Sequence, residues 1–377
     1  MANALNEHFS SICCSKSFES TCSIITDTVN NSSFSFSTIY PSEVQQAILE
    51  IKSSNGAGPD GLDIKFIKLS SHVLAFPLCD LFNLSLSTCS IPLMWKFAKV
   101  IPIHKGGDSM DVNNYRPISI ISNVAKIFEK LIFKQLSRYL NDFSLLTPNQ
   151  SGCRPNHSTT TALTAFTNYI FSAQDNNRST GAIFIDLTKA FDMVDHYILL
   201  DKLYAIGLSK SAVLWFNSYL HFRRQSVYLN VSFSKPRIME TGVPQGSSLG
   251  LLLFSIFINE LPKFSLDCQI HLYADDTVIY TSKFDISEIQ TSLQSDFNRI
   301  QTWFSSNLLL LNKKKSYSML FATRSTYHKQ NNSLEVQFLD GIPLENVEEF
   351  KYLGLWLDSQ LTFRPHIDSI IKKKFVD

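Results

Sequence analysis

The chain has 377 residues, 44% of them hydrophobic, which is enough to bury a large core shared by two or three subdomains. Its net charge is only +1, so the total charge favours no nucleic-acid partner, and no apolar run approaches the roughly 20 residues that a membrane span requires. The first residues lack the basic and apolar regions of a secretory signal, and the seven cysteines show no metal-binding spacing. These features predict an intracellular protein, in the nucleus and/or the cytoplasm and not secreted, with reduced thiols.

The N-terminal part of the chain is expected to be irregular and then helical. Residues 1–40 are rich in Ser, Thr, Asn and Cys with weak hydrophobic periodicity, which predicts a loosely ordered connector. The segment 41–95 is a predicted helical extension. Its first helix covers about 42–51, and a mainly helical stretch over 63–89 is expected to be interrupted near Pro77.

Strand and helix signals alternate after this extension. The run KVIPIH at 99–104 favours a strand, KGGD a turn, and NNYRPISIIS at 113–122 a returning strand, so Lys105 and Arg116 lie on a predicted hairpin. Residues 123–140 carry apolar side chains at a 3.6-residue period with Lys and Arg opposite, which predicts a helix.

Two stretches concentrate positive charge although the whole chain is nearly neutral. Residues 95–138 contain eight Lys or Arg against three acidic residues, and residues 310–330 contain five Lys or Arg and no acid. They flank the acidic segments described below, as expected if phosphates bind on either side of them. An ordinary solvated surface explains each stretch about equally well when it is judged alone.

A polar loop at 147–163, TPNQSGCRPNHSTTTAL, leads into a predicted threonine-rich helix. Arg154 and His157 in this loop are suited to contact a nucleic-acid backbone, and a role near the helix cap competes for His157. The apolar run AIFI at 182–185 then predicts a buried strand, at whose carboxyl end Asp186 lies.

Helices and a hairpin lead from there to a glycine-rich loop, GVPQGSSLG at 242–250. Asp192 and Asp195 lie near the start of the first of these helices, and helix capping explains them adequately, so neither is assigned to the metal site. In the loop, Gln245 supplies an amide able to bond sugar or base edges, and Gly246 and its fellow glycines let the backbone approach a ligand closely. A helix is expected over 251–261.

The stretch IHLYADDTVIY at 270–280 sets two aspartates, Asp275 and Asp276, between two β-prone runs. This pattern predicts a hairpin with both carboxylates at its tip. Adjacent acids in a tight turn repel each other, and a divalent cation offsets that repulsion. Asp186, at the end of its buried strand, is expected to meet the hairpin tip as a third carboxylate. A solvated turn is the alternative for the acidic pair taken alone.

The last part of the chain combines a helix with a β-run. Residues 286–305 form a predicted amphipathic helix, which leads to three consecutive lysines at 313–315. The run FKYLGLWLD at 350–358 predicts β structure around Gly354.

Several of these motifs occur together in one order. FIDLTKAFD, GVPQGSSLG and YADD follow one another at the spacing of a template-directed polymerase palm, and the combination is far more specific than any one motif. On these motifs the chain resembles the reverse transcriptase domain of non-LTR retrotransposons, the LINE or jockey-like mobile elements, from about Phe9 to Ile367. It departs from the family's usual Phe, Gly and Pro at Cys153, Asn156 and Leu251.

The resemblance implies an α+β fold of the right-hand polymerase type, with an antiparallel palm sheet backed by helices. The reverse transcriptase domain is expected over 96–357, after the connector and the helical extension. Its parts are the fingers at about 96–180, the palm at about 181–323 and a primer-grip-like hairpin at about 334–357. Only the start of a truncated thumb is expected, at 358–377, and no endonuclease is expected before the connector.

The resemblance also implies a two-metal polymerase site. Asp186 and Asp275, with a lesser role for Asp276, would hold two Mg²⁺, for which Mn²⁺ is a substitute. Lys315 takes the lysine position of the family's NxxK[TS] segment and would donate a proton or neutralise charge near the leaving pyrophosphate, although its two preceding lysine neighbours are equally basic.

Substrate contacts are implied at further positions. Lys105 and Arg116 would contact the triphosphate, and Arg116 is preferred because a guanidinium grips two phosphate oxygens at once. An ion pair that orders the loop is the alternative for Arg116. Phe191 matches the bulky ring that blocks a sugar 2′-hydroxyl and so favours deoxynucleotides, a role compatible with a core position. The remaining implied contacts are Gln245 and Gly246 to the nucleotide, and Arg154 and His157 to the template backbone.

The implied activity is RNA-directed DNA polymerisation, in which a DNA 3′-hydroxyl is extended on an RNA template. Its partners are template RNA, a DNA primer or target, and deoxynucleoside triphosphates, with no membrane; the sequence leaves the oligomeric state open. One alternative is a catalytically weak or inactive nucleic-acid-binding remnant, which Leu251 and the expected truncation favour. Another is a maturase-type enzyme of group II introns, which a segment beyond the thumb would reveal.

Overall fold

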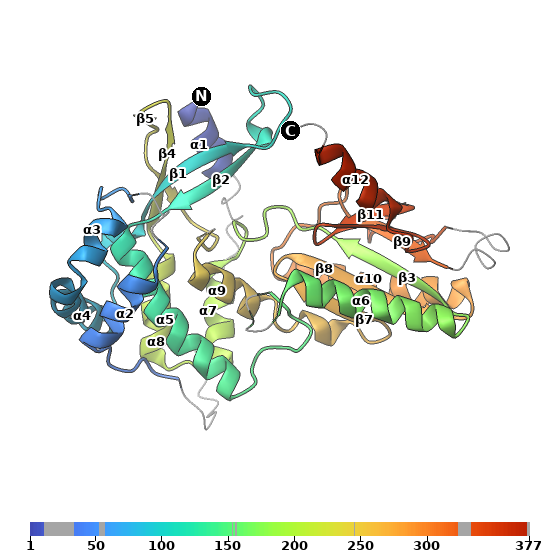
Figure 1. Ribbon diagram of the computed structural model, residues 1–377. Helices are drawn as coiled ribbons and strands as arrows, with labels where there is room; N and C mark the ends of the chain where they lie inside the picture. Colours follow the sequence, from blue (N-terminus) through green and yellow to red (C-terminus); the bar gives the residue numbers. More distant parts are fainter. Residues whose placement is uncertain are drawn as a thin grey trace. The chain divides into compact units, whose positions relative to one another are not determined.

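The computed structural model describes residues 1–10, 34–52, 57–152, 154, 157–244, 246–322 and 333–374. The chain divides into two units, which Figure 1 shows coloured along the sequence. Unit 1 comprises Met1–Leu146 and Phe191–Phe257, and unit 2 comprises Thr147–Ala190 and Ile258–Asp377. Within the described ranges, no helix has the length and apolar character needed to cross a bilayer.

The helices of unit 1 pack around α5, which contacts both α2 and α9. Their bounds are α2 Pro41–Glu50, α3 Ile64–Leu69, α4 Ser71–Ser87, α5 Asn123–Asp142, α7 His196–Ala205, α8 Lys210–Leu220 and α9 Ser248–Phe257. An aromatic cluster joins three of them. Phe128 of α5 stacks on Phe82 of α4 with ring centroids 4.5 Å apart, and meets Trp215 of α8 edge-on at 5.4 Å. The apolar faces that the sequence predicted therefore bury one another.

Two predicted helix boundaries were wrong. Pro77 does not interrupt the helical stretch but lies inside α4, and the break falls at Ser70 instead. The apolar face of α4, which includes the fully buried Phe82, outweighs the local cost of a proline inside a helix. The helix expected over 251–261 begins earlier and ends at Phe257, because Pro262 opens a separate 3₁₀ turn, η4 (Leu261–Phe264).

A sheet forms the second part of unit 1. Its strands are β1 Phe97–His104, β2 Tyr115–Ile120, β4 Arg223–Leu229, β5 Ser232–Phe233 and β6 Arg237–Met239. The predicted hairpin is confirmed, since β1 pairs antiparallel with β2 and Ile103 lies opposite Arg116. β1 also pairs in parallel with β4, which in turn pairs with β5 and β6. Short 3₁₀ turns, η2 (Leu93–Lys96) and η3 (Val112–Asn114), precede β1 and β2.

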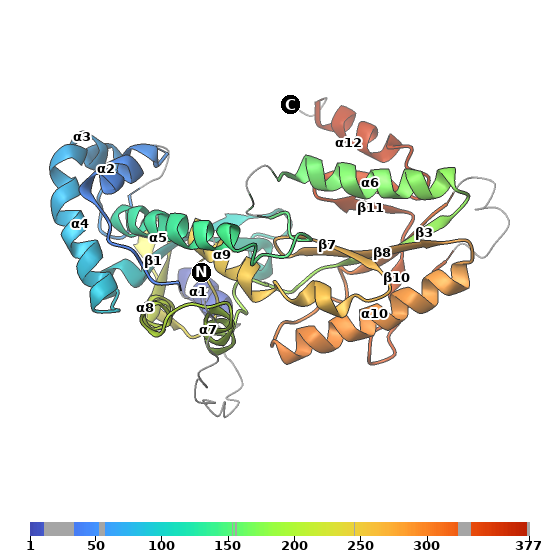
Figure 2. The same cartoon turned by 90° about the horizontal axis from the view of Figure 1, so that it is seen from below.

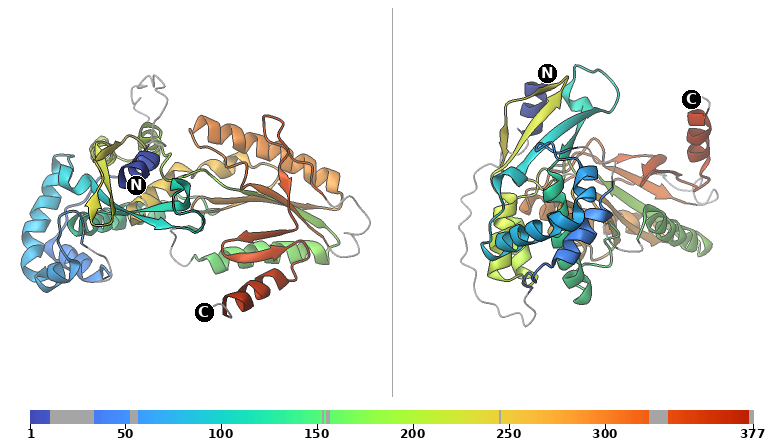
Figure 3. Two further views of the ribbon diagram at one scale, coloured as in Figure 1. Left: turned by 90° about the horizontal axis from the view of Figure 1, so that it is seen from above. Right: turned by 60° about the vertical axis from the view of Figure 1, so that its left-hand side comes forward.

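Nine residues near the start of the chain form a helix, α1 (Ala2–Ser10), where a loosely ordered connector was predicted. Leu5 and Phe9 of α1 pack with Val100 and Val227 of the sheet, and Figure 3 shows α1 beside these strands. The buried Asn6 side chain donates to the Lys235 carbonyl at 2.8 Å. These contacts are non-local, so the local periodicity of nine residues did not indicate them. Residues 11–33 of the predicted connector lie outside the described residues.

Unit 2 is built on a five-stranded sheet in the order β10-β9-β3-β8-β7. Its strands are β3 Ser179–Ile185, β7 Gln269–Tyr273, β8 Asp276–Lys283, β9 Tyr317–Phe321 and β10 Glu345–Asn346. Every residue of the central strand β3 is buried. The predicted strand before Asp186 is thus confirmed, and β3 pairs antiparallel with both β8 and β9.

Two helices cover the opposite faces of this sheet, α6 (Thr159–Asp175) and α10 (Ile286–Ser306), as Figure 2 shows. On the α6 face, Phe166 packs against Phe184 and Phe321. On the α10 face, Gly181 leaves room for Ile289, whose methyl carbon lies 2.3 Å from the position that a Cβ would occupy. The alternation of side chains along β3 explains why one strand serves both layers.

A second hairpin packs on the α6 face of the sheet. β11 (Glu349–Tyr352) and β12 (Leu355–Asp358) pair antiparallel and are followed by α12 (Arg364–Lys374). The predicted β-run around Gly354 is confirmed: Leu353 and Gly354 form its two-residue turn, both with positive φ, as the mirror-image turns of hairpins require. Phe350 of β11 stacks on Phe184 of β3 with centroids 4.3 Å apart, which fixes the hairpin to the sheet.

Candidate active site

The three predicted acidic residues gather at one end of the unit 2 sheet. Ile185, the last residue of β3, pairs with Thr277 of β8, so Asp186 and Asp276 are the next residues on the two facing strands. Directly opposite residues of antiparallel strands have Cα atoms about 4.5–5.5 Å apart and side chains on the same face. Asp275 lies in the turn that joins β7 to β8. The sheet register therefore brings residues 89 positions apart in sequence to one edge.

The turn itself differs from the prediction that it would carry both carboxylates at its tip. Tyr273 pairs with Asp276, so Ala274 and Asp275 are the two central residues and Asp276 belongs to β8. Ala274 has φ +54°, a region that non-glycine residues seldom adopt and that costs about 1–3 kcal/mol to hold. The right-handed twist of the flanking strands favours such a mirror-image turn, and the sequence pattern did not reveal where its two central positions fall.

The negative charges at this site raise the pKa values of Asp186 and Asp276. Partial burial, with the negative charges of Asp275 and Asp186, raises the pKa of Asp276 to about 6. Burial also raises the pKa of Asp186, and the Asp275 charge adds to it, while Lys315 and Asn312 act in the opposite direction. Nearby negative charges make ionisation of a carboxyl group less favourable. A bound cation would offset this repulsion and stabilise the ionised forms.

A short segment after α10 holds Asp186 in place. The Asn312 Nδ2 donates to Asp186 Oδ2 at 2.8 Å, and the Asn312 backbone N–H donates to the Asp186 carbonyl at 2.9 Å. The Asp186 backbone N–H in turn donates to Ser316 Oγ at 3.1 Å. Of the three lysines in the same segment, Lys315 is the one whose charge acts on Asp186, whereas Lys313 pairs with Asp340. This geometry favours Lys315 over Lys313 as the cation beside the carboxylates.

Carboxylate oxygens are suitable ligands for a hard divalent cation, but the three described acids do not form a closed coordination shell. Among the described residues, no group of three or more His, Cys, Asp or Glu side chains is arranged to enclose a metal ion. Mg²⁺ is usually bound through one or two carboxylates, with waters and substrate phosphates supplying the remaining oxygens. Asp186 and Asp275 meet that smaller requirement. Burial and the nearby Asp275 charge raise the pKa of Asp186, so a cation that offsets the negative charge fits beside it.

The predicted template contacts have partners within their own loop. Arg154 donates to the Thr147 carbonyl at 3.0 Å, and His157 Nδ1 lies 3.2 Å from Ser151 Oγ. Ser151 Oγ also lies 2.8 Å from His271 Nε2 of β7, and His271 Nδ1 lies 3.1 Å from the Tyr352 hydroxyl of β11. A chain of polar side chains thus links the loop, the strand before the acidic turn and the second hairpin. Cys153 and Asn156 lie outside the described residues.

Several predicted substrate contacts fall in unit 1. The Phe191 ring stacks on Phe254 of α9 with centroids 4.5 Å apart and remains half-buried. Gly246 has φ +89° and open space where a Cβ would stand, so its loop leaves room beside the backbone. The close approach at Gly242 is instead to the Asp192 backbone, which a Cβ would meet at 2.9 Å. Gln245 lies outside the described residues.

Of the two aspartates predicted to cap α7, Asp195 is the capping residue, and Asp192 lies three residues before it. The Asp195 carboxylate accepts from the Tyr197 and Ile198 backbone N–H groups, which confirms it as the cap of α7. Arg116 is exposed on β2, and Lys105 follows β1 in the turn of the same hairpin.

Part of the basic stretch 95–138 has structural partners. Lys130 and Lys134 both pair with Glu50, and they lower its pKa to about 2. Lys96 is buried. Three of the cations in this stretch thus have structural roles and do not indicate a phosphate-binding surface. Arg116, by contrast, is exposed to solvent. In the second stretch, Arg324 and Lys329 lie outside the described residues.

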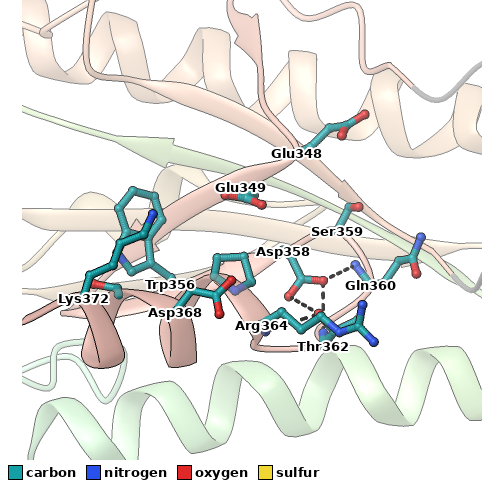
Figure 4. Close-up of a pocket in the computed structure, with 12 residues that line it drawn as sticks. Glu348, Glu349, Trp356, Asp358, Ser359, Gln360, Thr362, Arg364, Asp368 and Lys372 are labelled. Carbon is teal, nitrogen blue, oxygen red and sulfur yellow. Dashed lines mark hydrogen bonds between the residues drawn. The ribbon is translucent and has the colours of Figure 1, made fainter. Parts of the chain in front are cut away.

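A cavity of about 850 Å³ lies between the β11–β12 hairpin and α12 (Figure 4). Trp356, Arg364 and Lys372 line it together with acidic residues, among them Asp368. Its floor is ordered by Asp358, whose carboxylate accepts hydrogen bonds from the backbone of the following loop. The acids at the end of β3 and in the β7–β8 turn do not line this cavity.

Sequence reasoning missed three residues that support the predicted motifs. Asn312 anchors Asp186, and the buried Gln150 holds the turn that carries Asp275. In unit 1, the buried Glu129 accepts from the Ser247 and Tyr219 hydroxyls at 2.6 Å each, which connects α5 to the glycine-rich loop at 242–250. Asn312 and Gln150 lie in segments that resemble the family's motifs, and this resemblance was the only sign of their importance. For Glu129 the sequence showed only a polar residue within a helix that is otherwise largely apolar on its buried face.

Comparisons with known proteins agree with the motifs. Residues 103–357 match the family described as reverse transcriptase (RNA-dependent DNA polymerase). Over 345 residues the chain is 31% identical to a probable RNA-directed DNA polymerase from transposon BS of Drosophila melanogaster, covering 88% of this chain and 37% of that protein.

Two further relatives come from the same organism. The chain is 31% identical over 336 residues to the RNA-directed DNA polymerase from mobile element jockey, covering 87% of this chain and 36% of that protein. It is 26% identical over 342 residues to a probable RNA-directed DNA polymerase from transposon X-element. The chain spans little more than a third of the length of these relatives. The expected resemblance to non-LTR retrotransposon enzymes is confirmed, and the chain belongs to the reverse transcriptase family.

Proposed function

We propose that the chain is an RNA-directed DNA polymerase, which extends a DNA 3′-hydroxyl on an RNA template. The observation that carries the proposal is the meeting of Asp186 with the Asp275–Asp276 turn at one edge of the unit 2 sheet, in a chain of the reverse transcriptase family. We further propose that this sheet is the palm, that the β1–β2 hairpin belongs to the fingers and that the β11–β12 hairpin is a primer grip.

Asp186 and Asp275, with a lesser contribution from Asp276, are the residues that would hold two Mg²⁺ ions, or Mn²⁺ in their place. When bound, such ions supply Lewis acidity that favours the deprotonated 3′-oxygen and stabilises the leaving oxygen. In the step, the 3′-hydroxyl loses its proton to solvent water, its oxygen forms a bond to the α-phosphorus, the bond from that phosphorus to the oxygen that bridges to the β-phosphorus breaks, and pyrophosphate leaves. Lys315 would donate a proton to the pyrophosphate or offset its charge.

The chain's other residues bind and orient the substrates in this proposal. Arg116 and Lys105 would grip the triphosphate, and Phe191 would exclude a ribose 2′-hydroxyl. Gln245 and Gly246 would lie against the nucleotide, and Arg154 and His157 against the template. Asn312 fixes the Asp186 carboxylate before substrate arrives, because its amide already bonds Oδ2.

Primer extension tests the proposal. The purified chain, given Mg²⁺, an RNA template with an annealed DNA primer and deoxynucleotides, is expected to lengthen the primer. Asp275→Asn should abolish extension while primer–template affinity changes less than about twofold, since the side chain keeps its size and loses the charge that binds a cation. Exchange of an acid outside the site, Asp142→Asn at the end of α5, is the control and should leave extension unchanged. Extension that survives Asp275→Asn would contradict the assigned site.

A further inference from the structure

The segment before α6 forms an additional partner for the strand that leads to the acidic turn. The Leu272 backbone N–H donates to the Asn149 carbonyl, and the Ser151 N–H donates to the Leu272 carbonyl, both at 2.9 Å. Gln150 thereby forms a parallel bridge to Leu272 of β7. The Asn149 side chain adds a bond of 2.7 Å to the Ile270 carbonyl. The outer edge of β7 is therefore occupied by this segment and has a fixed register with it.

The buried side chain of Gln150 reaches from this segment to the turn. Its Oε1 accepts from the Ala274 backbone N–H at 3.1 Å and from the Gly152 N–H at 2.7 Å. Its Nε2 donates to the Ala274 carbonyl at 3.5 Å, a longer and weaker contact. One amide group thus meets both peptide groups that flank Ala274, the residue with positive φ. Gln150 is only 1% exposed, so water does not compete for these bonds.

The backbone at Gly152 closes around the same turn. A Cβ on Gly152 would stand 2.5 Å from the Ala274 nitrogen and 2.9 Å from Gln150 Oε1. The first of these atoms is backbone, so any side chain at this position has to displace the turn. Since Ala274 precedes Asp275, displacement of its peptide groups redirects the Asp275 carboxylate.

We propose that Gln150 is a positioning residue for Asp275: it holds the strained Ala274 peptide groups so that the Asp275 carboxylate faces Asp186 before any ligand binds. The inference rests on the proposed polymerase function and adds a residue to it. In this proposal, Gln150 contacts neither the substrates nor the cation; it affects the Asp275 carboxylate only by holding the backbone of Ala274. The competing role, a glutamine that merely satisfies buried backbone groups, predicts a loss of stability without any selective effect on cation binding or on kcat.

Gln150→Met tests the inference, because methionine has a similar length and no hydrogen-bonding amide. The matched control is Gln294→Met in the same unit, since Gln294 likewise exchanges two hydrogen bonds with backbone, those of Gln337, away from the acids. The readouts are Mn²⁺ affinity measured by electron paramagnetic resonance, kcat and KM for primer extension, and amide hydrogen exchange of residues 270–280.

For Gln150→Met we expect Mn²⁺ affinity and kcat each to fall about tenfold or more, with KM for nucleotide changed less than about threefold. The Ala274 amide should exchange faster, while amides of β3 keep their protection. Gln294→Met should leave all three readouts at their original values. Equal effects of the two variants, or unchanged Mn²⁺ affinity in Gln150→Met, would overturn the positioning role.

A second variant keeps the inference testable if methionine prevents folding. Gln150→Glu retains an oxygen that accepts from both N–H groups but loses the Nε2 donor that reaches the Ala274 carbonyl, so protection of the Ala274 amide should fall by less than about tenfold. Exchange at Ala274 as fast as in an unfolded chain, in a folded Gln150→Glu variant, would contradict the inference. Failure of the inference is distinguishable from failure of the proposed function, because the latter would be seen as primer extension surviving Asp275→Asn while the former leaves that variant inactive.

Discussion

At the scale of single residues, the Asp186 carboxylate depends on one amide neighbour. Asn312→Asp would replace a donor 2.8 Å from Asp186 Oδ2 by a fourth carboxylate beside the three acids of the site, which raises the pKa of Asp186 further. We expect the Mg²⁺ concentration for half-maximal extension to rise about 10- to 100-fold, and more than in Asn312→Ala, which only removes the bond. Asn298→Ala on α10 is the control. Equal Mg²⁺ requirements for the two Asn312 variants would show that charge at this position does not matter.

The Phe191 ring gives a prediction about sugar selection. Phe191→Ala removes the half-buried ring that stacks on Phe254, and the proposed exclusion of a 2′-hydroxyl should go with it. The ratio of kcat/KM for deoxynucleotides over ribonucleotides is expected to fall at least about tenfold, which corresponds to roughly 1.4 kcal/mol of lost discrimination. Phe143→Ala, an exposed position in the same unit, is the control. An unchanged ratio would leave Phe191 as a packing residue.

The buried His196 of α7 predicts a pH dependence of stability. Its Nε2 bonds the Gly242 carbonyl at 2.8 Å, and its buried Nδ1 has no hydrogen-bond partner among the residues that the structure describes. Burial lowers the pKa of His196 to about 4. Because the folded-state pKa lies below the unfolded value, this contribution to stability is present above pH about 6.5 and is lost as the pH falls towards 4.

The free energy of unfolding should therefore decrease by on the order of 3 kcal/mol from His196 alone over that range. In His196→Gln, the amide donates to the same carbonyl and stays neutral. The number of protons taken up on unfolding, which sets the slope of the unfolding free energy against pH, should therefore be smaller by up to one. Urea unfolding between pH 7 and 4 measures it, with His72→Gln on the exposed face of α4 as the control. Identical slopes for the original chain and His196→Gln would refute the assignment.

At the scale of elements, the contact between β3 and α10 depends on one glycine. A Cβ on Gly181 would stand 2.3 Å from a methyl of Ile289 and 2.8 Å from one of Leu293. Gly181→Ala should lower the free energy of unfolding by about 1–3 kcal/mol through overpacking. Adding Ile289→Ala should relieve the clash, so that the double variant loses about 1 kcal/mol less than the sum of the two single variants. If the losses of unfolding free energy in the two single variants simply add in the double variant, α10 moves away from β3 without strain, and the predicted clash is absent.

The elements also show what local sequence reasoning can reach. The strand before Asp186, the β1–β2 hairpin and the cap at Asp195 were predicted because hydrophobic periodicity and capping chemistry are local signals. α1 and the unbroken α4 were not, because their stability comes from packing against distant residues. The exact centre of the acidic turn depends on strand twist and on Gln150, which lies more than 120 positions away from Ala274.

At the scale of the whole molecule, the candidate site is an assembly of separated segments within unit 2. The sheet register brings Asp186 to Asp276, the segment after α10 supplies Asn312 and Lys315, and the loop before α6 supplies Gln150. The sequence motifs pointed to the three acids and the lysine because a resemblance to a family includes the positions of its catalytic residues, and their catalytic roles stay predictions. The supporting amides escaped, because each one acts through a contact that only the folded chain creates.

Iron-directed cleavage of the backbone shows whether Asp186 and the Asp275–Asp276 turn bind one cation site together. Fe²⁺ replaces Mg²⁺ at carboxylate sites, and with ascorbate and peroxide it generates hydroxyl radicals that cut the chain near the bound ion. We predict cuts close to residues 186 and 274–276, suppressed by excess Mg²⁺ and absent in the Asp186→Asn, Asp275→Asn double variant, with fragments identified by mass spectrometry. Cuts confined to other parts of the chain, or cuts at these positions that persist in the double variant, would contradict the account.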